Sequence, residues 1–175
     1  MSLTEKSASF SVLDPPLQQA LVCDGSLTRH LETTTGKPLR VRLERQTLRP
    51  SWQENLVLWQ GLPQLPVGKE ILVREAWLSI ARKDLIFAHS EMLLDGLAQV
   101  VRSAVEQGEE PLGMVFQERD GEVSRQHLEL ARVRAPELAL RAGMLPHHPF
   151  WCRRSLFLTG SVMRARILEM FLAWP

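Results

Sequence analysis

A series of short strand-like segments joined by tight turns is the feature that most limits the folds open to this chain. Leucine and valine alternate with charged residues over 39–43, which is typical of a strand with one buried face. The apolar segment 70–80 is followed by the polar turn 81–84 and by a second apolar segment, 85–89. Further strands are predicted at residues 113–117, 125–133, 151–158 and 162–172. Such short connections favour antiparallel pairing, because parallel strands need long crossovers.

Helical spacing of apolar residues interrupts this series in three places. Asp14 precedes two prolines and predicts a helix start, and Ser26 predicts the N-cap of a second short helix that runs to about Glu32. A third helix is predicted over 92–105 and ends near Gly108. This order of elements predicts an α+β fold with an antiparallel sheet, and a length of 175 residues suits one domain over the whole chain.

Charge and composition exclude several classes of protein. The 21 Lys and Arg residues nearly balance the 20 Asp and Glu residues, so the chain has no electrostatic reason to bind nucleic acid or an anionic membrane. No apolar run approaches the ~20 residues of a membrane helix, and the N-terminal segment does not resemble a secretory signal. Cys23 and Cys152 are too few for a cysteine-only zinc site. We expect two reduced thiols in a cytoplasmic, monomeric protein.

Two charged residues stand in otherwise apolar rows of the predicted strands. Side chains alternate between the two faces of a strand, so every second residue belongs to one row. Glu169 is the only polar member of the odd-numbered row from 163 to 171, and Arg74 is the only charged member of the even-numbered row from 72 to 80. The opposite row of the last strand begins with Val162, Arg164 and Arg166, and we expect these side chains to be exposed to solvent.

The burial of Arg74 and Glu169 would require partners. A buried carboxylate must find a donor or take up a proton, whereas a guanidinium keeps its proton and needs an anion. The anion beside Arg74 is Glu169, another carboxylate or a ligand. The pair is therefore either a structural salt bridge or a binding site, in which Arg74 holds a substrate carboxylate and Glu169 serves hydroxyl binding or proton chemistry.

No other motif predicts a metal, nucleotide or serine-hydrolase site. The five histidines lack the spacing of metal ligands, and the glycines form neither a dinucleotide fingerprint nor a P-loop. There is no G-x-S-x-G sequence. Arg153 and Arg154 are adjacent in a predicted strand, so they point to opposite faces and at most one can line a pocket.

Five short segments together carry a family resemblance. They are Ser26-Leu27-Thr28-Arg29, Leu72-Val73-Arg74-Glu75, Pro111-Leu112-Gly113, Trp151-Cys152-Arg153-Arg154-Ser155 and Leu168-Glu169-Met170-Phe171-Leu172. In order and spacing they resemble the chorismate pyruvate-lyases, which split chorismate into 4-hydroxybenzoate and pyruvate at the head of bacterial ubiquinone synthesis. The segments extend over most of the chain.

The resemblance implies an antiparallel sheet whose helical flaps close over a buried ligand chamber, and a reaction without a metal or organic cofactor. Arg74 stands where the family's arginine binds the ring carboxylate, and Glu169 stands where its glutamate meets the ring hydroxyl. Leu112 stands where a backbone group contacts the ligand, and Leu27 corresponds to a flap residue over it. Arg74 and Glu169 are therefore the expected catalytic residues.

One position departs from the family's pattern. The family's third strand usually ends in an Ala-Gly-Arg-Thr type of sequence, whose arginine helps to hold the enolpyruvyl carboxylate. Here the strand reads Phe87-Ala88-His89-Ser90, so His89 takes the place of that arginine as the expected substrate-binding residue. A neutral imidazole binds a carboxylate more weakly than a guanidinium does, and Arg153 or Arg154 is the candidate to compensate.

Three functions are compatible with these residues. The first is a cofactor-free lyase that orients chorismate, excludes water and stabilises the departing enolate, with Glu169 as hydroxyl-binding group or acid. The alternative is a non-catalytic module that binds small aromatic acids, because the lyase fold resembles the effector domains of some bacterial transcription regulators. Residues 1–37 are too short and too neutral for the DNA-binding domain of such a regulator. The third is a structural protein with an Arg74–Glu169 salt bridge and no pocket.

Overall fold

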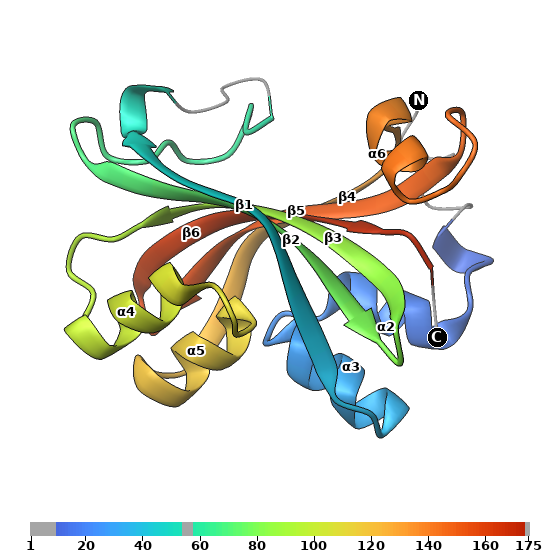
Figure 1. Cartoon of the computed structure of the whole chain (residues 1–175), viewed down its shortest axis with the longest axis horizontal. Helices are drawn as coiled ribbons and strands as arrows, with labels where there is room; N and C mark the ends of the chain where they lie inside the picture. The colour runs from blue at the N-terminus through green and yellow to red at the C-terminus, as the bar shows by residue number, and fades with distance from the viewer. Residues whose placement is uncertain (1–9, 54–57, 174–175) are drawn as a thin grey trace.

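A six-stranded antiparallel sheet forms the centre of the molecule. In the computed structural model, which describes residues 10–53 and 58–173, the strand order is β1-β2-β3-β6-β5-β4 (Figure 1). The strands are β1 (Leu39–Pro50), β2 (Glu70–Ile80), β3 (Lys83–Leu93), β4 (Val123–Arg134), β5 (Pro149–Thr159) and β6 (Val162–Phe171). Every neighbouring pair is antiparallel, so the predicted α+β class is confirmed.

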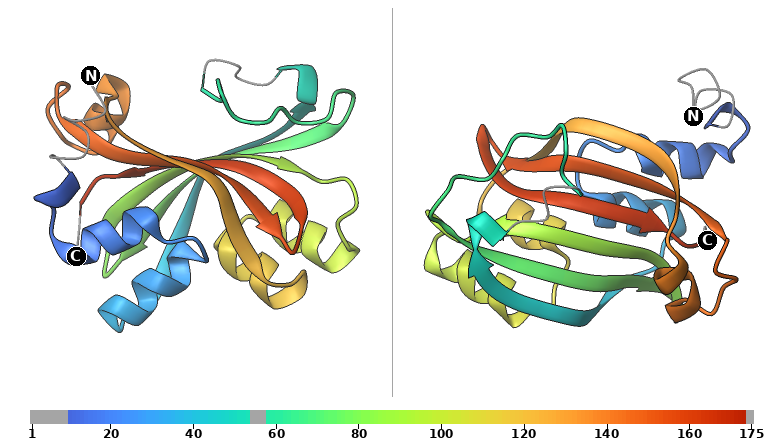
Figure 2. Two further views of the ribbon diagram at one scale, coloured as in Figure 1. Left: turned by 180° about the vertical axis from the view of Figure 1, so that it is seen from behind. Right: turned by 90° about the horizontal axis from the view of Figure 1, so that it is seen from above.

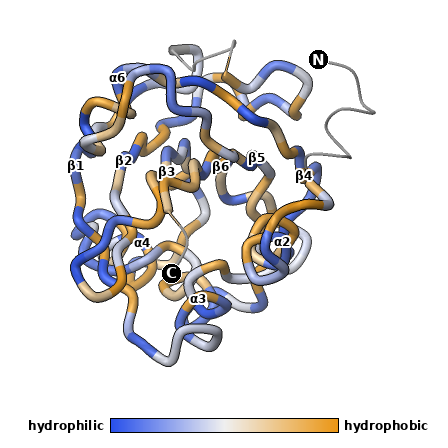
Figure 3. Tube along the Cα trace, turned by 90° about the vertical axis from the view of Figure 1, so that its right-hand side faces the viewer, coloured by the Kyte–Doolittle hydropathy of each residue, from blue (hydrophilic) through white to orange (hydrophobic). Residues whose placement is uncertain are grey.

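Helices cover the two faces of the sheet unequally (Figures 1 and 2). One face is covered by α2 (Pro15–Val22), α3 (Leu27–Thr35), α4 (Gln99–Gln107) and α5 (Leu112–Arg119). The opposite face carries α6 (Pro136–Arg141) and the described part of the segment between β1 and β2, which begins with the 3-10 turn η1 (Ser51–Gln53). Figure 3 shows the strands side by side from β1 to β4, with α6 on one side and α2, α3 and α4 on the other. Within the described residues, no helix has the length and apolar character needed to cross a membrane.

The first two helices begin where the sequence predicts. Asp14 is the N-cap residue of α2, and the side chain of Ser26 caps α3 by accepting a hydrogen bond from the amide of Arg29 at 3.4 Å. The second helix runs three residues past its predicted end and stops at Gly36. The φ of Gly36 is 64°, a left-handed conformation that glycine adopts without strain.

Two predicted elements were wrong. The helix predicted over 92–105 begins only at Gln99, because Met92 extends β3 and pairs with both β2 and β6. The strand predicted over 113–117 is part of α5. Residues 92–94 and 114–116 are short apolar runs, whose pattern does not separate a strand from a helix.

The strand register places the predicted charged residues close together. On the helix-covered face, two adjacent rows run across β2, β3, β6 and β5: Arg74–Ser90–Ile167–Ser155 and Ala76–Ala88–Glu169–Arg153. Arg74 and Glu169 thus lie in neighbouring rows, with β3 between their strands. The residues between them are Ala76, Ala88 and Ser90, whose small side chains leave open space above the sheet.

The opposite face is closed as well, and it contains a buried ion cluster. Arg166, which was expected to be wet, is fully buried because its Nη2 donates to Glu91 at 2.7 Å and Trp59 lies over its guanidinium at 5.1 Å. Arg49 donates to the other oxygen of Glu91. Burial raises the pKa of Glu91, but hydrogen bonds from His89 and Arg166 outweigh it and lower the pKa to about 2. The cluster helps to fasten the segment between β1 and β2 to the sheet.

Candidate functional site

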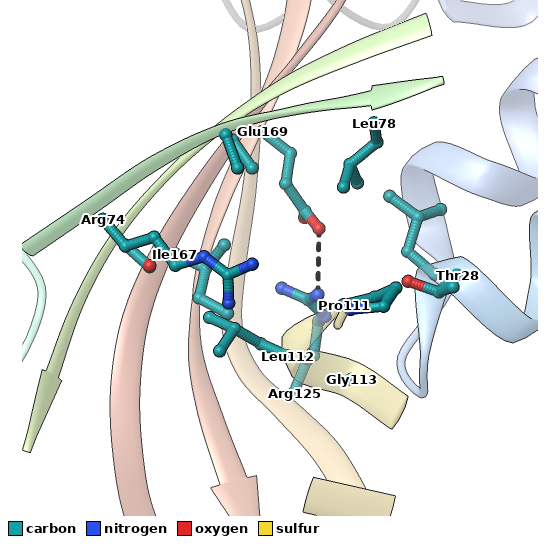
Figure 4. A pocket seen from close by; sticks show the side chains of 13 residues that line it. Thr28, Arg74, Leu78, Pro111, Leu112, Gly113, Arg125, Ile167 and Glu169 are labelled. Carbon is teal, nitrogen blue, oxygen red and sulfur yellow. Dashed lines mark hydrogen bonds and ion pairs between the residues drawn. The ribbon is translucent and has the colours of Figure 1, made fainter. Parts of the chain in front are cut away.

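A cavity lies between the helix-covered face of the sheet and the helices α3 and α5. Its empty volume is about 480 Å³ when the open space at its mouth is counted. The floor comes from β2, β3 and β6, and the walls come from α3, from the start of α5 and from β4. In Figure 4, Arg74 and Glu169 point into the same hollow from different strands, and Arg125 approaches Glu169 from β4.

Arg74 is a buried cation with unused hydrogen-bonding capacity. It is 3 % exposed, and its Nη2 donates to the carbonyl oxygens of Gly108 at 2.9 Å and Glu110 at 3.0 Å. Its Nε and Nη1 are buried, and among the described residues they have no hydrogen-bond partner. Burial lowers the pKa of Arg74 to about 10, so the group stays charged at neutral pH. Carbonyl oxygens do not neutralise a guanidinium, so Arg74 can bind an anion from the cavity.

Glu169 is an ionised carboxylate held between two arginines. Its Oε1 accepts from Nη2 of Arg125 at 3.0 Å, and its Oε2 accepts from Nε of Arg153 at 2.6 Å. Burial raises the pKa of Glu169, but the charges and hydrogen bonds of Arg125 and Arg153 outweigh it and hold the pKa below its usual range. Glu169 is therefore an acceptor at neutral pH.

The structural alternative fails on this geometry. The part of the chain that the structure describes contains no ion pair between Arg74 and Glu169, because Glu169 binds Arg125 and Arg153 instead. The cavity between Arg74 and Glu169 also contradicts a solid interior.

Arg125 is the lining residue that the sequence did not reveal. Its side chain is 4 % exposed, and its Nη1 donates to Oγ of Ser155 at 3.0 Å, while its Nε donates to the carbonyl of Gly25 at 3.5 Å. By simple alternation its row on β4 would also contain Val123, His127 and Glu129, so no apolar row marked it as unusual. A bulge between Gln126 and Glu129 breaks this alternation and places Glu129 beside Arg154 on the other face. Burial lowers the pKa of Arg125 to about 10, while the charge of Glu169 raises it, and the group remains a cation.

The two adjacent arginines of β5 point to opposite faces, as predicted. Arg153 is fully buried on the helix-covered face, where its Nη1 donates to the carbonyls of Ala20 at 2.8 Å and Cys23 at 2.9 Å. It thereby ties the end of α2 to Glu169. Arg154 lies on the other face and pairs with Glu129 at 2.7 Å.

His89 does not reach the cavity. Its neighbours Ala88 and Ser90 line the cavity, and alternation along β3 turns the imidazole to the other face of the sheet. There its Nδ1 lies 3.3 Å from Oε1 of Glu75, and its ring lies 6.1 Å from that of Trp59. The substrate-binding role expected of His89 is therefore corrected: its carboxylate contacts are structural ones on the far face.

Leu27 and Leu112 both line the cavity, from α3 and from the start of α5. The two helices meet where Gly113 faces Ser26, since a Cβ on Gly113 would lie 2.7 Å from Oγ of Ser26. The first amides of α5 have no acceptor within the helix. The wall of the cavity thus combines apolar side chains with backbone donors at one end.

The arrangement suits an acidic aromatic ligand that also carries a hydroxyl group. Arg74 offers two donors for a carboxylate, Glu169 accepts from a hydroxyl, and Leu27, Leu78 and Ile167 provide apolar surface for a ring. The described residues contain no group of His, Cys, Asp and Glu side chains suited to hold a metal ion.

Comparisons with known proteins agree with this fold. Residues 21–173 match the family model described as chorismate pyruvate-lyase Rv2949c-like. No curated protein sequence matches the chain. Among solved structures, PhnF from Mycobacterium smegmatis is similar with a TM-score of 0.61 at 14% identity, over 98% of this chain and 85% of that chain. The ligand-binding domain of a GntR-family transcriptional regulator from Bordetella bronchiseptica has a TM-score of 0.56 at 18% identity, over 77% of this chain and 84% of that chain.

At such identities the solved structures show a shared fold alone. The family match is of another kind, because it extends over most of the sequence, from the end of α2 to the residues that follow β6. It confirms the resemblance that the five short segments carry. The chain belongs to the chorismate pyruvate-lyase Rv2949c-like family.

Proposed function

We propose that the protein is a lyase that converts chorismate into 4-hydroxybenzoate and pyruvate without a cofactor. The observation that carries the proposal is buried Arg74, which lines the cavity together with ionised Glu169 and has two donor nitrogens without a hydrogen-bond partner among the described residues. A buried cation without an anionic partner is costly to fold, and a ligand carboxylate would supply the missing charge.

In the proposed complex the ring carboxylate of chorismate binds Nε and Nη1 of Arg74. The ring hydroxyl, on the opposite side of the ring, donates to Glu169. Leu27, Leu78 and Ile167 contact the ring, and the amide of Leu112 is a further donor at the start of α5. These contacts orient the substrate and keep water from it.

The reaction is an elimination across two adjacent ring carbons. The bond between the ring and the ether oxygen breaks, and its electron pair leaves with the enolpyruvate. The neighbouring carbon, which bears the hydroxyl, loses its proton, and the ring becomes aromatic. The enolpyruvate takes up one proton and becomes pyruvate. Because Glu169 is ionised, its part in the proposal is that of an acceptor for the hydroxyl rather than that of an acid.

A second candidate is a module that binds small aromatic acids without turnover. The likeness to the ligand-binding domain of a GntR-family regulator favours it, since that neighbour is a domain that binds a ligand. Both candidates use the same cavity, so chemistry is what separates them.

The experiment follows 4-hydroxybenzoate and pyruvate after addition of chorismate to the purified protein. We expect both products in equal amounts, and loss of turnover in Arg74→Ala and Glu169→Gln. Arg45→Ala is the matched control, because Arg45 pairs with Glu75 at the surface of the other face and should leave turnover unchanged. Thermal stabilisation by 4-hydroxybenzoate without turnover would favour the binding module instead.

A further inference from the structure

The charged side chains in and next to the cavity contain more buried positive charge than one carboxylate would balance. Arg74, Arg125 and Arg153 contribute three cations, and Glu169 is the one anion bonded to any of them among the described residues. These four groups therefore sum to a charge of +2, from three positive charges and one negative charge. All four side chains are buried. A ligand with a single carboxylate at Arg74 would leave one cation unbalanced, at the end of the cavity where Glu169 lies.

Only one of the two arginines at that end can meet a ligand. Arg153 does not line the cavity, and its Nη1 is directed to the carbonyls of Ala20 and Cys23. Arg125 does line the cavity. A guanidinium has five N–H donors, and three of those of Arg125 serve Gly25, Ser155 and Glu169. One N–H on each of Nη1 and Nη2 remains for a further acceptor.

We propose that Arg125 is a second anion anchor, which makes the site specific for a ring with two acidic groups. The first group binds Arg74, and the second binds Arg125 beside the hydroxyl that Glu169 accepts. The inference rests on the proposed function in one respect: in chorismate the second group is the enolpyruvyl carboxylate. Glu169 and Arg125 lie 3.0 Å apart, which suits a hydroxyl and an ether-linked carboxylate on adjacent ring carbons.

This assignment explains how the site can do without His89. The cation for the second carboxylate comes from β4, across the sheet from the β3 position where the resemblance places it. The assignment also predicts that Arg125 binds the substrate and the product differently. 4-Hydroxybenzoate lacks the second carboxylate, so Arg125 contributes to holding the substrate and contributes little to holding the aromatic product.

The test measures binding of two unreactive aromatic acids that differ in one charge. The probes are 3-(carboxymethoxy)-4-hydroxybenzoate and its uncharged counterpart 3-methoxy-4-hydroxybenzoate, titrated by calorimetry against the wild type, Arg125→Met and Arg74→Met. A charge-assisted pair is worth enough for the wild type to prefer the dicarboxylate by about 10-fold or more. Arg125→Met should remove that preference and leave the affinity for the methoxy probe within about 3-fold, because Arg153 still holds Glu169. Arg74→Met should weaken both probes.

The outcomes separate this inference from the proposed function. A preference that depends on Arg125 in a protein that leaves chorismate unchanged would support the second anchor and contradict the lyase. The second anchor would be overturned if the wild type turned over chorismate but did not prefer the dicarboxylate probe. It would also be overturned if that preference survived in Arg125→Met. Neither result would contradict the lyase. Should Arg125→Met fail to fold, Arg125→Lys replaces it. Lysine has its donors on one ammonium nitrogen and cannot bind a carboxylate with the planar fork of arginine, so the preference should fall by at least about 3-fold, and an unchanged preference would overturn the inference.

Discussion

Arg74 and Glu169 line one cavity from neighbouring rows of the sheet, yet each is bonded to other groups. Arg74 donates to two backbone carbonyls, whereas Glu169 accepts from Arg125 and Arg153. The cation therefore keeps donors for a ligand, and the anion is fixed in its ionised form. Substitutions of the two residues should therefore have opposite effects on the stability of the free protein.

Replacing Arg74 should abolish ligand binding without destabilising the free protein. In Arg74→Met the buried charge and its two unpaired nitrogens disappear, so the free energy of unfolding should be unchanged or higher. Stabilisation by 4-hydroxybenzoate in a thermal melt should be lost. Arg166→Met is the matched control, because Arg166 is equally buried but bonded to Glu91, and its loss should cost about 3–5 kcal/mol. Equal destabilisation by both variants would contradict this account of Arg74.

Neutralising Glu169 should destabilise the fold as well as the site. Glu169→Gln leaves Arg125 and Arg153 buried without an anion, so urea unfolding should show a loss of about 3–5 kcal/mol. Glu129→Gln serves for comparison, because Glu129 pairs with Arg154 at the surface and its loss should cost less than about 1 kcal/mol. A Glu169→Gln variant as stable as the wild type would show that the two arginines find other partners.

The contact between α5 and α3 should depend on Gly113 and Ser26 as a pair. In Gly113→Ala the new Cβ would lie 2.7 Å from Oγ of Ser26, so the start of α3 must move and the affinity for 4-hydroxybenzoate should fall by about 10-fold. Ser26→Gly alone removes that oxygen and should cost only a few tenths of a kcal/mol, since glycine is a tolerated N-cap. The double variant should recover most of the affinity. Additive losses in the double variant would show that the two residues do not meet.

The buried cluster on the far face should make stability fall in acid. The pKa of Glu91 is lowered to about 2 from an ordinary value of 4.5. Its contribution to stability is therefore complete above about pH 5 and is lost as the pH falls through 2. The shift corresponds to about 3 kcal/mol. The difference in unfolding free energy between the wild type and Glu91→Gln should accordingly be largest at pH 7 and should narrow between pH 5 and pH 2. A difference that stays constant over this range would contradict the ionised, paired state of Glu91.

The sequence predicted those parts of the site that break a strong local pattern. Arg74 and Glu169 each interrupt an apolar row, so burial of the row predicts an unusual environment for the charge. The same reasoning placed Arg153 and Arg154 on opposite faces. Most strands were predicted because alternation and tight turns act over a few residues.

The rest depended on contacts between distant segments. Arg125 lies in a polar row, and only the strand order brings it to Glu169. His89 was assigned to the site from its position in the family's pattern. Alternation along a strand decides which face a side chain occupies, and a shift of one position moves it to the opposite face. Arg166 was expected to be wet because its partner, Glu91, belongs to a different strand. Pairs of residues from different strands cannot be predicted from the pattern of either strand alone.

Turnover of chorismate by the wild-type protein, followed alongside Arg74→Met, is the most direct test of the central claim that the unneutralised Arg74 serves catalysis. We expect the wild type to release 4-hydroxybenzoate and pyruvate in equal amounts and the variant to release neither. A folded wild-type protein that binds 4-hydroxybenzoate and leaves chorismate intact would contradict the lyase and assign the cavity to binding alone.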